Sequence, residues 1–251
     1  MRHPLHAVMD QQTASNNVLR LPDQPRLWNE LQVNRYEFPV YALGTDPEQA
    51  RSAIVCVHNR TSSPERFIRL GQSLLAHEDA GNVAIIALGA PEYSTFWYPK
   101  EAFDSPLETQ HPYLEFSLAA LEQLCLRLAD HISIEDVSLF GFADGGCLVL
   151  EYMVRCGYPL NAVLALSGVL LGSSLESSDR FSTASTRTKV LLTIGGGISA
   201  ALRVRFRQTE QLLKQFGYKV IALSYERRPD TIAPDELAMA RNIIYGTFAA
   251  E

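Results

Sequence analysis

The chain has 251 residues, of which 47% are hydrophobic, and its formal net charge is −6 at pH 7. This length can bury one large core, and a single α/β domain of this size is common. The acidic balance and the lack of a lysine- or arginine-rich run argue against nucleic acid as a partner. No apolar run reaches the roughly 18 residues that span a bilayer. We therefore expect neither a nucleic-acid nor a membrane partner.

The N-terminal part of the chain differs from the rest. Residues 1–30 are polar and interrupted by prolines, and the first residues lack the apolar stretch of a signal peptide. We predict a loosely ordered N-terminal extension over residues 1–35 and one domain over residues 36–251. Without a signal peptide, the expected location is cytoplasmic.

The cysteines indicate buried thiols. They fall in apolar or helical segments without C-x-x-C spacing, and no cysteine–histidine pair has the spacing of zinc ligands. We therefore expect a reducing compartment, no metal and no cofactor. The four positions are Cys56, Cys125, Cys147 and Cys156.

Short apolar runs predict the strands. The first, residues 36–43, reads as an edge strand because Pro39 has no N–H to donate to a ladder. The later runs are continuous and rich in β-branched residues, which is typical of parallel strands covered on both faces. They are residues 52–59, 82–89, 136–142, 161–168, 189–196 and 218–225.

Helical patterns separate these runs. One begins near Pro64, a second near Pro112, a third at the capping residue Ser199, and a fourth covers residues 233–248. Alternating strands and helices predict a doubly wound, mostly parallel sheet. In such sheets ligands bind beyond the carboxyl ends of the strands.

The stretch SLFGFADGGCLVLEYMVRCG, residues 138–157, reads as a buried strand, a sharp turn and a helix. Gly141, Gly145 and Gly146 give the room that a G-x-S-x-G nucleophile elbow requires, but Ala143 stands at the position of the nucleophile. Neither this stretch nor residues 193–199 contain G-x-G-x-x-G, so a dinucleotide site is not expected.

Four segments resemble the carboxylesterase/phospholipase branch of the α/β-hydrolases, which includes the acyl-protein thioesterases. They are VCVHNRTSSPERF (55–67), APEYSTFWYP (90–99), GFADGG (141–146) and ALSGVLL (165–171). The resemblance extends over about residues 50 to 248. It implies a single-domain α/β-hydrolase fold and a site at the elbow.

The chain departs from that family at all three triad positions. The resemblance places Ala143 at the nucleophile, Ile198 at the acid and Asp230 at the histidine. The histidines themselves exclude a triad in the family's order of nucleophile, acid and histidine, because none follows the elbow. They are His3, His6, His58, His77, His111 and His131.

Other residues near the elbow are candidates for binding. In the resembled oxyanion loop, Asn59 replaces a glycine and is expected to tolerate left-handed backbone angles, so that His58 and Arg60 face the mouth of the pocket. His58 could instead be a hydrogen-bonded structural histidine, and Arg60 a solvated surface charge. Trp97 and Tyr98 could be core aromatics or the wall of an apolar pocket.

Charged residues after two strands add further candidates. Asp144 could stabilise the helix N-terminus or act as a nucleophile. Its charge would oppose an oxyanion, which argues against acyl transfer. After the last predicted strand, Arg228 or Asp230 could contact a polar group of a ligand.

We therefore interpret the chain as a non-hydrolytic α/β-hydrolase relative that binds a small apolar or ester-like molecule and that can form a homodimer. The alternatives are a lyase, isomerase or cyclase that uses His58, Arg60, Asp144 or Asp230 for acid–base work, an esterase with an unrecognised arrangement, and a structural subunit of an active paralogue.

Overall fold

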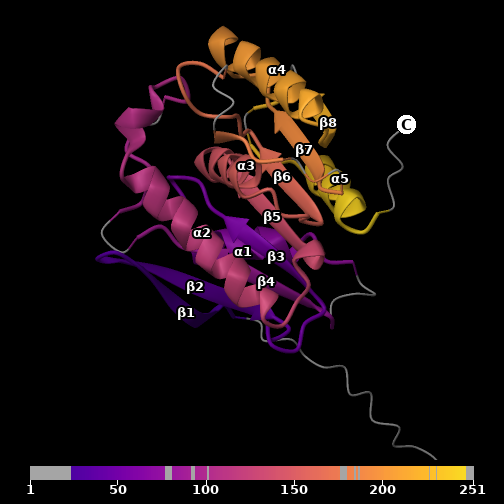
Figure 1. Cartoon of the computed structure of the whole chain (residues 1–251). Coiled ribbons are helices and arrows are strands. Elements are labelled where there is room, and N and C mark those ends of the chain that lie inside the picture. The colour runs from indigo at the N-terminus through magenta and orange to yellow at the C-terminus, as the bar shows by residue number, and fades with distance from the viewer. Residues whose placement is uncertain are drawn as a thin grey trace, which may run out of the picture.

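An eight-stranded sheet forms the centre of the molecule, and helices cover both of its faces (Figure 1). The computed structural model describes residues 24–76, 81–91, 94–100, 102–175, 180–183, 185, 187–225, 227–229 and 231–246. The strands are β1 (Arg26–Val33), β2 (Tyr36–Gly44), β3 (Ser52–Val57), β4 (Val83–Leu88), β5 (Val137–Phe142), β6 (Ala162–Leu166), β7 (Lys189–Ile194) and β8 (Lys219–Ser224). The six runs expected as parallel strands are confirmed.

The strands lie in the order β1-β2-β4-β3-β5-β6-β7-β8. Strand β2 pairs antiparallel with β1 and with β4, and all other neighbours are parallel. The pairs Val57↔Gly141 and Phe142↔Leu166 align the carboxyl ends of β3, β5 and β6 at one edge. The segments that follow these three strands therefore meet there.

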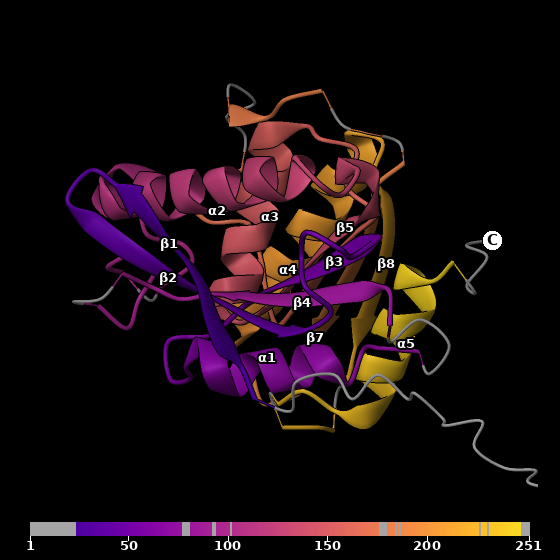
Figure 2. The same cartoon turned by 90° about the horizontal axis from the view of Figure 1, so that it is seen from below.

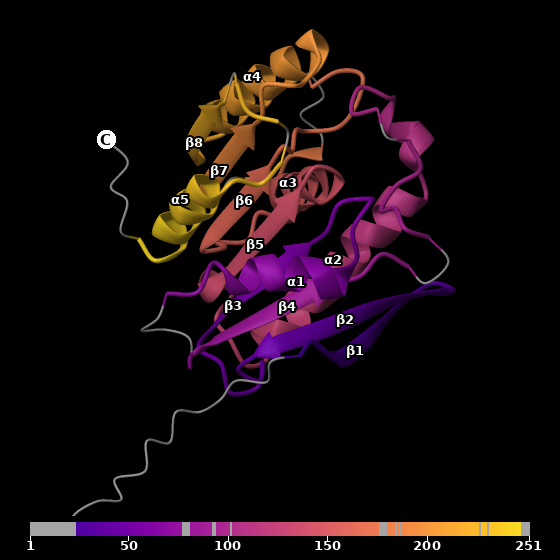
Figure 3. The ribbon, with the colours of Figure 1, turned by 180° about the vertical axis from the view of Figure 1, so that it is seen from behind.

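The helices form two layers. The core on one face includes residues of α2, α3 and α4, and the core on the other face includes residues of α1 and α5, as Figures 2 and 3 show. Their bounds are α1 (Pro64–Gln72), α2 (Tyr113–Ala129), α3 (Asp144–Cys156), α4 (Ala200–Gln215) and α5 (Pro234–Ile244). None of the helices in the described part of the chain is long and apolar enough to cross a membrane.

Burial on both faces explains why the central strands are apolar throughout. Along β3, Val55 and Val57 face the α2–α4 side, whereas Ile54 and Cys56 face the α1–α5 side. Successive side chains of a strand point to opposite faces, so a strand covered on both sides needs an apolar residue at every position.

The N-terminal boundary differs from the sequence-based prediction. Arg26–Val33 is strand β1, with Leu31 and Val33 buried, so at least this part of the predicted extension belongs to the domain. Residues 1–23 lie outside the described residues.

The strand predicted at 36–43 is confirmed, but it is not the edge of the sheet, because β1 pairs with it. Pro39 is tolerated because it lies beyond the last β2–β4 pair and only its carbonyl is used there, accepting from Gly89 N–H at 2.8 Å.

Candidate functional site

Ala143 occupies the apex of a nucleophile-elbow turn. Its backbone has φ 49° and ψ −114°, a conformation that L-residues rarely adopt. The N–H of Ala143 donates to Leu166 O at 2.9 Å, and its carbonyl accepts from Cys147 N–H at 2.8 Å. These bonds tie the turn to β6 and to the first turn of α3. The strained backbone of an elbow is present, with a methyl group at its apex.

The predicted role of the glycines is confirmed. A Cβ on Gly141 would lie 2.3 Å from Gly145 O, and a Cβ on Gly145 would lie 2.1 Å from Val57 O. Gly146 packs in the same way against Gly168, where an added Cβ would lie 2.6 Å from the Gly146 carbonyl carbon. The approach of α3 to β3 and to the end of β6 therefore depends on the missing side chains.

Of the two interpretations that the sequence left open for His58, the structure supports the hydrogen-bonded structural histidine. His58 is 2% exposed, and the centre of its imidazole ring lies 4.9 Å from that of the Trp97 ring. Nδ1–H donates to Asn59 O at 2.8 Å, and Nε2 accepts from Ala90 N–H at 3.3 Å. Both ring nitrogens are thus engaged in the neutral tautomer, and burial lowers the pKa of the imidazole. No nitrogen is left for acid–base work.

Asn59 does not adopt left-handed backbone angles. The non-glycine residues with positive φ in the described chain are Asn34, Ala143 and Ser167. Asn59 instead uses its Nδ2 to donate to Thr61 Oγ1 at 2.9 Å. The prediction that Asn59 replaces the family's glycine by adopting left-handed backbone angles is therefore wrong. The loop follows a path that asparagine adopts without strain.

Arg60, Tyr98 and Asp144 form a cluster next to the elbow. The Arg60 backbone N–H and its Nε both donate to Asp144 Oδ2, at 3.2 and 3.3 Å. Arg60 Nη2 donates to Tyr98 O at 3.0 Å, and the Tyr98 hydroxyl lies 3.4 Å from Asp144 Oδ1. The side chains of Arg60 and Asp144 are each 17% exposed. Sequence reasoning named all three residues, and the structure brings them together.

The position of the Asp144 carboxylate has a chemical consequence. In an α/β-hydrolase the oxyanion hole combines the N–H of the residue after the nucleophile with an N–H from the loop after the equivalent of β3. Here Arg60 supplies an N–H from that loop, and it donates to a carboxylate of the chain itself. A developing oxyanion would meet a negative charge at this point, which is unfavourable.

Trp97 and Tyr98 are core aromatics. Trp97 is completely buried and its Nε1 donates to His58 O at 2.7 Å, while Tyr98 is 1% exposed. Burial raises the pKa of the Tyr98 hydroxyl well above its usual range. Ser117 of α2, which sequence reasoning did not single out, holds this segment by donating to Trp97 O at 2.6 Å. A serine on an apolar helix face was the only signal for it.

The cysteines are thiols, as predicted. Cys56, Cys125 and Cys147 are buried, and Cys156 is half-buried. Cys147 Sγ accepts from Val169 N–H at 3.4 Å, and burial raises the pKa of this thiol to about 12. A thiol with such a pKa is a poor nucleophile.

Ile198, at the position of the catalytic acid, does not join the cluster. Ile198 is half-buried against the core, and Asp230 lies outside the described residues. Arg228 turns to α5, where its Nη1 donates to Asp235 Oδ1 at 2.5 Å, and it stacks over the Tyr225 ring at 4.1 Å. Its expected contact with a ligand over the elbow therefore has no support in this arrangement.

The described residues contain no group of three histidine, cysteine or acidic side chains that could hold a metal ion. In the described cluster beside the elbow, the partly exposed groups that can act on a ligand are the Arg60 guanidinium and the Asp144 carboxylate. This set can bind a polar group or move a proton.

Comparisons with known proteins agree with this fold. A sequence profile of the Phospholipase/Carboxylesterase family matches residues 87–247, which is more than half of the chain. The chain therefore belongs to this α/β-hydrolase family. A search of curated proteins finds no match.

Solved structures of esterases are similar over most of their length. A phospholipase/carboxylesterase from Dyadobacter fermentans DSM 18053 is 26% identical with a TM-score of 0.74, and the match covers 82% of this chain and 95% of that one. A carboxylesterase from Mesorhizobium loti is 14% identical with a TM-score of 0.66, covering 87% and 99%. The Bacillus cereus carboxylesterase is 10% identical with a TM-score of 0.66, covering 86% and 96%. The last two share the fold alone with this chain.

Proposed function

We propose that this chain is a non-hydrolytic member of the family that binds a small apolar or ester-like molecule beside the elbow. The observation that carries the proposal is the Asp144 carboxylate, which accepts from the Arg60 N–H next to Ala143. A methyl group cannot attack an ester, and a carboxylate at this N–H opposes the charge that acyl transfer develops.

The sequence supports the same proposal. No histidine follows His131, so the order of nucleophile, acid and histidine cannot be completed in this chain. Removing the catalytic machinery of a serine hydrolase lowers the rate by about 10⁶-fold. Binding a ligand, unlike hydrolysing it, needs neither a nucleophile nor a general base.

A second candidate is a lyase, isomerase or cyclase. It is favoured by the contact between Arg60 and Asp144, which places a guanidinium and a carboxylate at the carboxyl ends of the strands. In this candidate Asp144 is the base and Arg60 orients the substrate. The buried, fully hydrogen-bonded His58 has no part in it.

The experiment compares ligand binding with conversion. Short-chain esters and the matching amides are added to the wild type and to Asp144→Asn, thermal unfolding is followed, and the ligands are then analysed for products. A binding protein is stabilised by about 2.7 kcal/mol at a hundred times Kd. The proposal expects such a shift with unchanged ligand in both proteins.

Conversion would contradict the proposal in one of two ways. A product formed by the wild type and not by Asp144→Asn supports the second candidate. Hydrolysis by both proteins identifies an esterase with another catalytic arrangement. The expected homodimer and the expected cytoplasmic location stay predictions. Light scattering of the purified protein measures its oligomeric state.

A further inference from the structure

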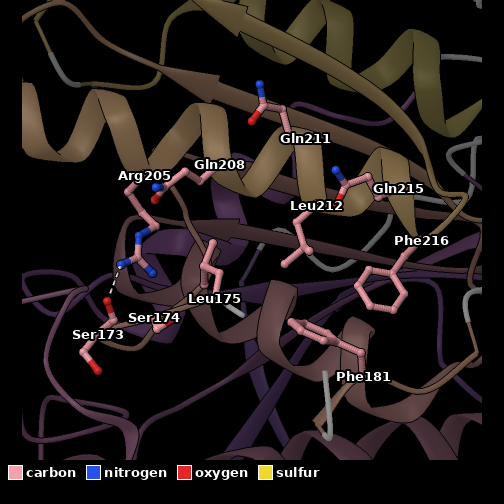
Figure 4. Close-up of a pocket in the computed structure, with 10 residues that line it drawn as sticks. All are labelled: Ser173, Ser174, Leu175, Phe181, Arg205, Gln208, Gln211, Leu212, Gln215 and Phe216. Carbon is pink, nitrogen blue, oxygen red and sulfur yellow. Dashed lines mark hydrogen bonds between the residues drawn. The ribbon is translucent and has the colours of Figure 1, made fainter. Parts of the chain in front are cut away.

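A cavity of about 890 Å³ lies between α4 and the segment after β6, away from the elbow. Its volume is in the range of small-molecule sites in proteins. It has no lining residue in common with the elbow cluster, so an inference about it does not rest on the proposed function. Figure 4 shows the lining residues, which are Ser173, Ser174, Leu175, Phe181, Arg205, Gln208, Gln211, Leu212, Gln215 and Phe216.

One end of the cavity is polar. Arg205 extends from α4 toward Ser173, with Gln208 and Ser174 beside it (Figure 4). Although Arg205 is only 6% exposed, its Nη1 and Nη2 make only long bonds, both of 3.4 Å, to Leu170 O and Ser173 O. No carboxylate oxygen of the described residues lies within ion-pair distance of it. The guanidinium carbon also lies 5.6 Å from the centre of the Phe103 ring. A nearly buried guanidinium that contacts only two carbonyl groups and an aromatic ring among the described residues can still bind an anion.

A second arginine adds positive charge near this end. Arg180 Nη2 donates to Leu171 O at 2.9 Å, so Arg180 and Arg205 converge on the same short segment. Within the described residues, Nε and Nη1 of Arg180 are buried without a hydrogen-bond partner. The buried Glu151 is shared by Arg180, at 3.5 Å, and Arg155, at 3.1 Å. The exposed Asp104 is in electrostatic reach of Arg205.

The other end of the cavity is apolar. The rings of Phe181 and Phe216 lie 4.9 Å apart at an interplanar angle of 42°, and Leu212 points toward them (Figure 4). Leu175 lies between this group and Ser174. An aromatic ring or a short alkyl chain would gain about 25 cal/mol for each Å² of apolar surface that it buries here.

We propose that this cavity binds a small amphipathic carboxylate, whose carboxylate pairs with Arg205 and whose aromatic or alkyl body lies against Leu212, Phe181 and Phe216. A planar carboxylate matches the two-pronged donor geometry of a guanidinium. The apolar end selects acids with a hydrophobic body over acetate or inorganic anions.

Titration calorimetry with 3-phenylpropanoate tests the proposal, and neutral 3-phenylpropanamide is the matched ligand. We expect saturable binding of the acid with Kd below about 1 mM. The amide should bind about tenfold more weakly because it lacks a charge-assisted hydrogen bond. If the acid gives no heat of binding, or if the acid and the amide bind with equal affinity, the proposal is wrong.

One exposed position on α4, Gln208, supplies two variants that leave the fold intact. Gln208→Glu should weaken binding of the acid about three- to fivefold, and Gln208→Lys should strengthen it, because the new charge lies at the polar end. Gln72→Glu on α1, on the opposite face of the sheet, is the matched control and should bind like the wild type. Equal affinity in both Gln208 variants contradicts the proposed site.

Arg205 itself is tested against its neighbour Arg207, which is exposed on the same helix. Arg205→Met should lose about tenfold in affinity for the acid and little for the amide, whereas Arg207→Met should change neither. Thermal unfolding of each variant reports whether it is folded. If Arg205→Met proves unfolded, the comparison of Gln208→Glu with Gln208→Lys tests the proposed site instead.

Discussion

At the apex of the elbow, Ala143 has the backbone angles that project a nucleophile from this turn in serine hydrolases. Such angles are costly for a non-glycine residue, by about 1–3 kcal/mol. They persist here because bonds to Leu166 and Cys147 and the close packing of glycines leave the turn no other path. The backbone conformation therefore does not depend on a reactive side chain.

The first residue-scale prediction concerns Ala143→Ser. We expect no hydrolysis of p-nitrophenyl acetate above the wild-type level, because a serine hydroxyl needs a base and His58 uses both ring nitrogens in hydrogen bonds. Ala143→Gly is the matched control for changes in the turn. Saturable ester cleavage by the serine variant alone would refute the argument.

The second residue-scale prediction is a pH effect from His58. Burial holds the pKa of this imidazole below its usual 6.5, so as the pH falls below that value the unfolded chain takes up a proton that the folded chain does not. The contribution of the neutral His58 ring to the free energy of unfolding is complete above the pKa of histidine in the unfolded chain, and it decreases as the pH falls.

Thermal unfolding between about pH 7 and about pH 5 measures this effect, which is up to about 1.4 kcal/mol per pH unit. The wild type should lose more stability over this range than His58→Asn. His131→Asn, at an exposed histidine, should keep the wild-type slope. Parallel curves for the wild type and His58→Asn would contradict the burial argument.

Some residues of the site could be predicted from the sequence and some could not. Arg60 and Asp144 were candidates because each follows a predicted strand, but their contact joins positions 84 residues apart, which spacing cannot show. The burial of His58 depends on Trp97, 39 positions later, whose indole covers it. Arg205 was not a candidate, since it falls within the helix predicted from Ser199 and nothing local in the sequence indicates the cavity beside it.

At the scale of elements, the central strands and the helices were predictable because burial on two faces leaves long apolar runs. The hairpin of β1 and β2 was missed. Its first strand buries only Leu31 and Val33, and the register shifts between Leu27 and Asn29, which interrupts the alternation of apolar residues. Asn34, with φ 54° in the two-residue connection, was the signal that could have revealed the turn.

The element-scale prediction concerns the contact between α3 and β3. Gly145→Ala should destabilise the protein by about 3 kcal/mol, because the added methyl group would lie 2.1 Å from Val57 O and 2.7 Å from His58 O, which are backbone atoms. Gly197→Ala is the matched control, since no atom lies within 4 Å of its added Cβ. Urea unfolding of both variants measures the difference. Equal midpoints would show that α3 can move away from β3 at little cost.

At the scale of the whole molecule, the strand order brings the ends of β3, β5 and β6 together, and this edge holds the elbow, the loop with Arg60 and the segment with Ser167. The family fold is thus retained around an apex that carries a methyl group. The α4 cavity lies on the flank of the same domain. Binding at the flank and binding at the elbow can therefore be tested separately.

The measurement that tests the central claim most directly is the hydrolysis of short p-nitrophenyl esters by the purified wild-type protein, against a blank without protein. We predict a rate equal to the blank, since Ala143 offers no nucleophile and the Asp144 carboxylate occupies the Arg60 N–H. Robust, saturable turnover would contradict it and identify the protein as an esterase.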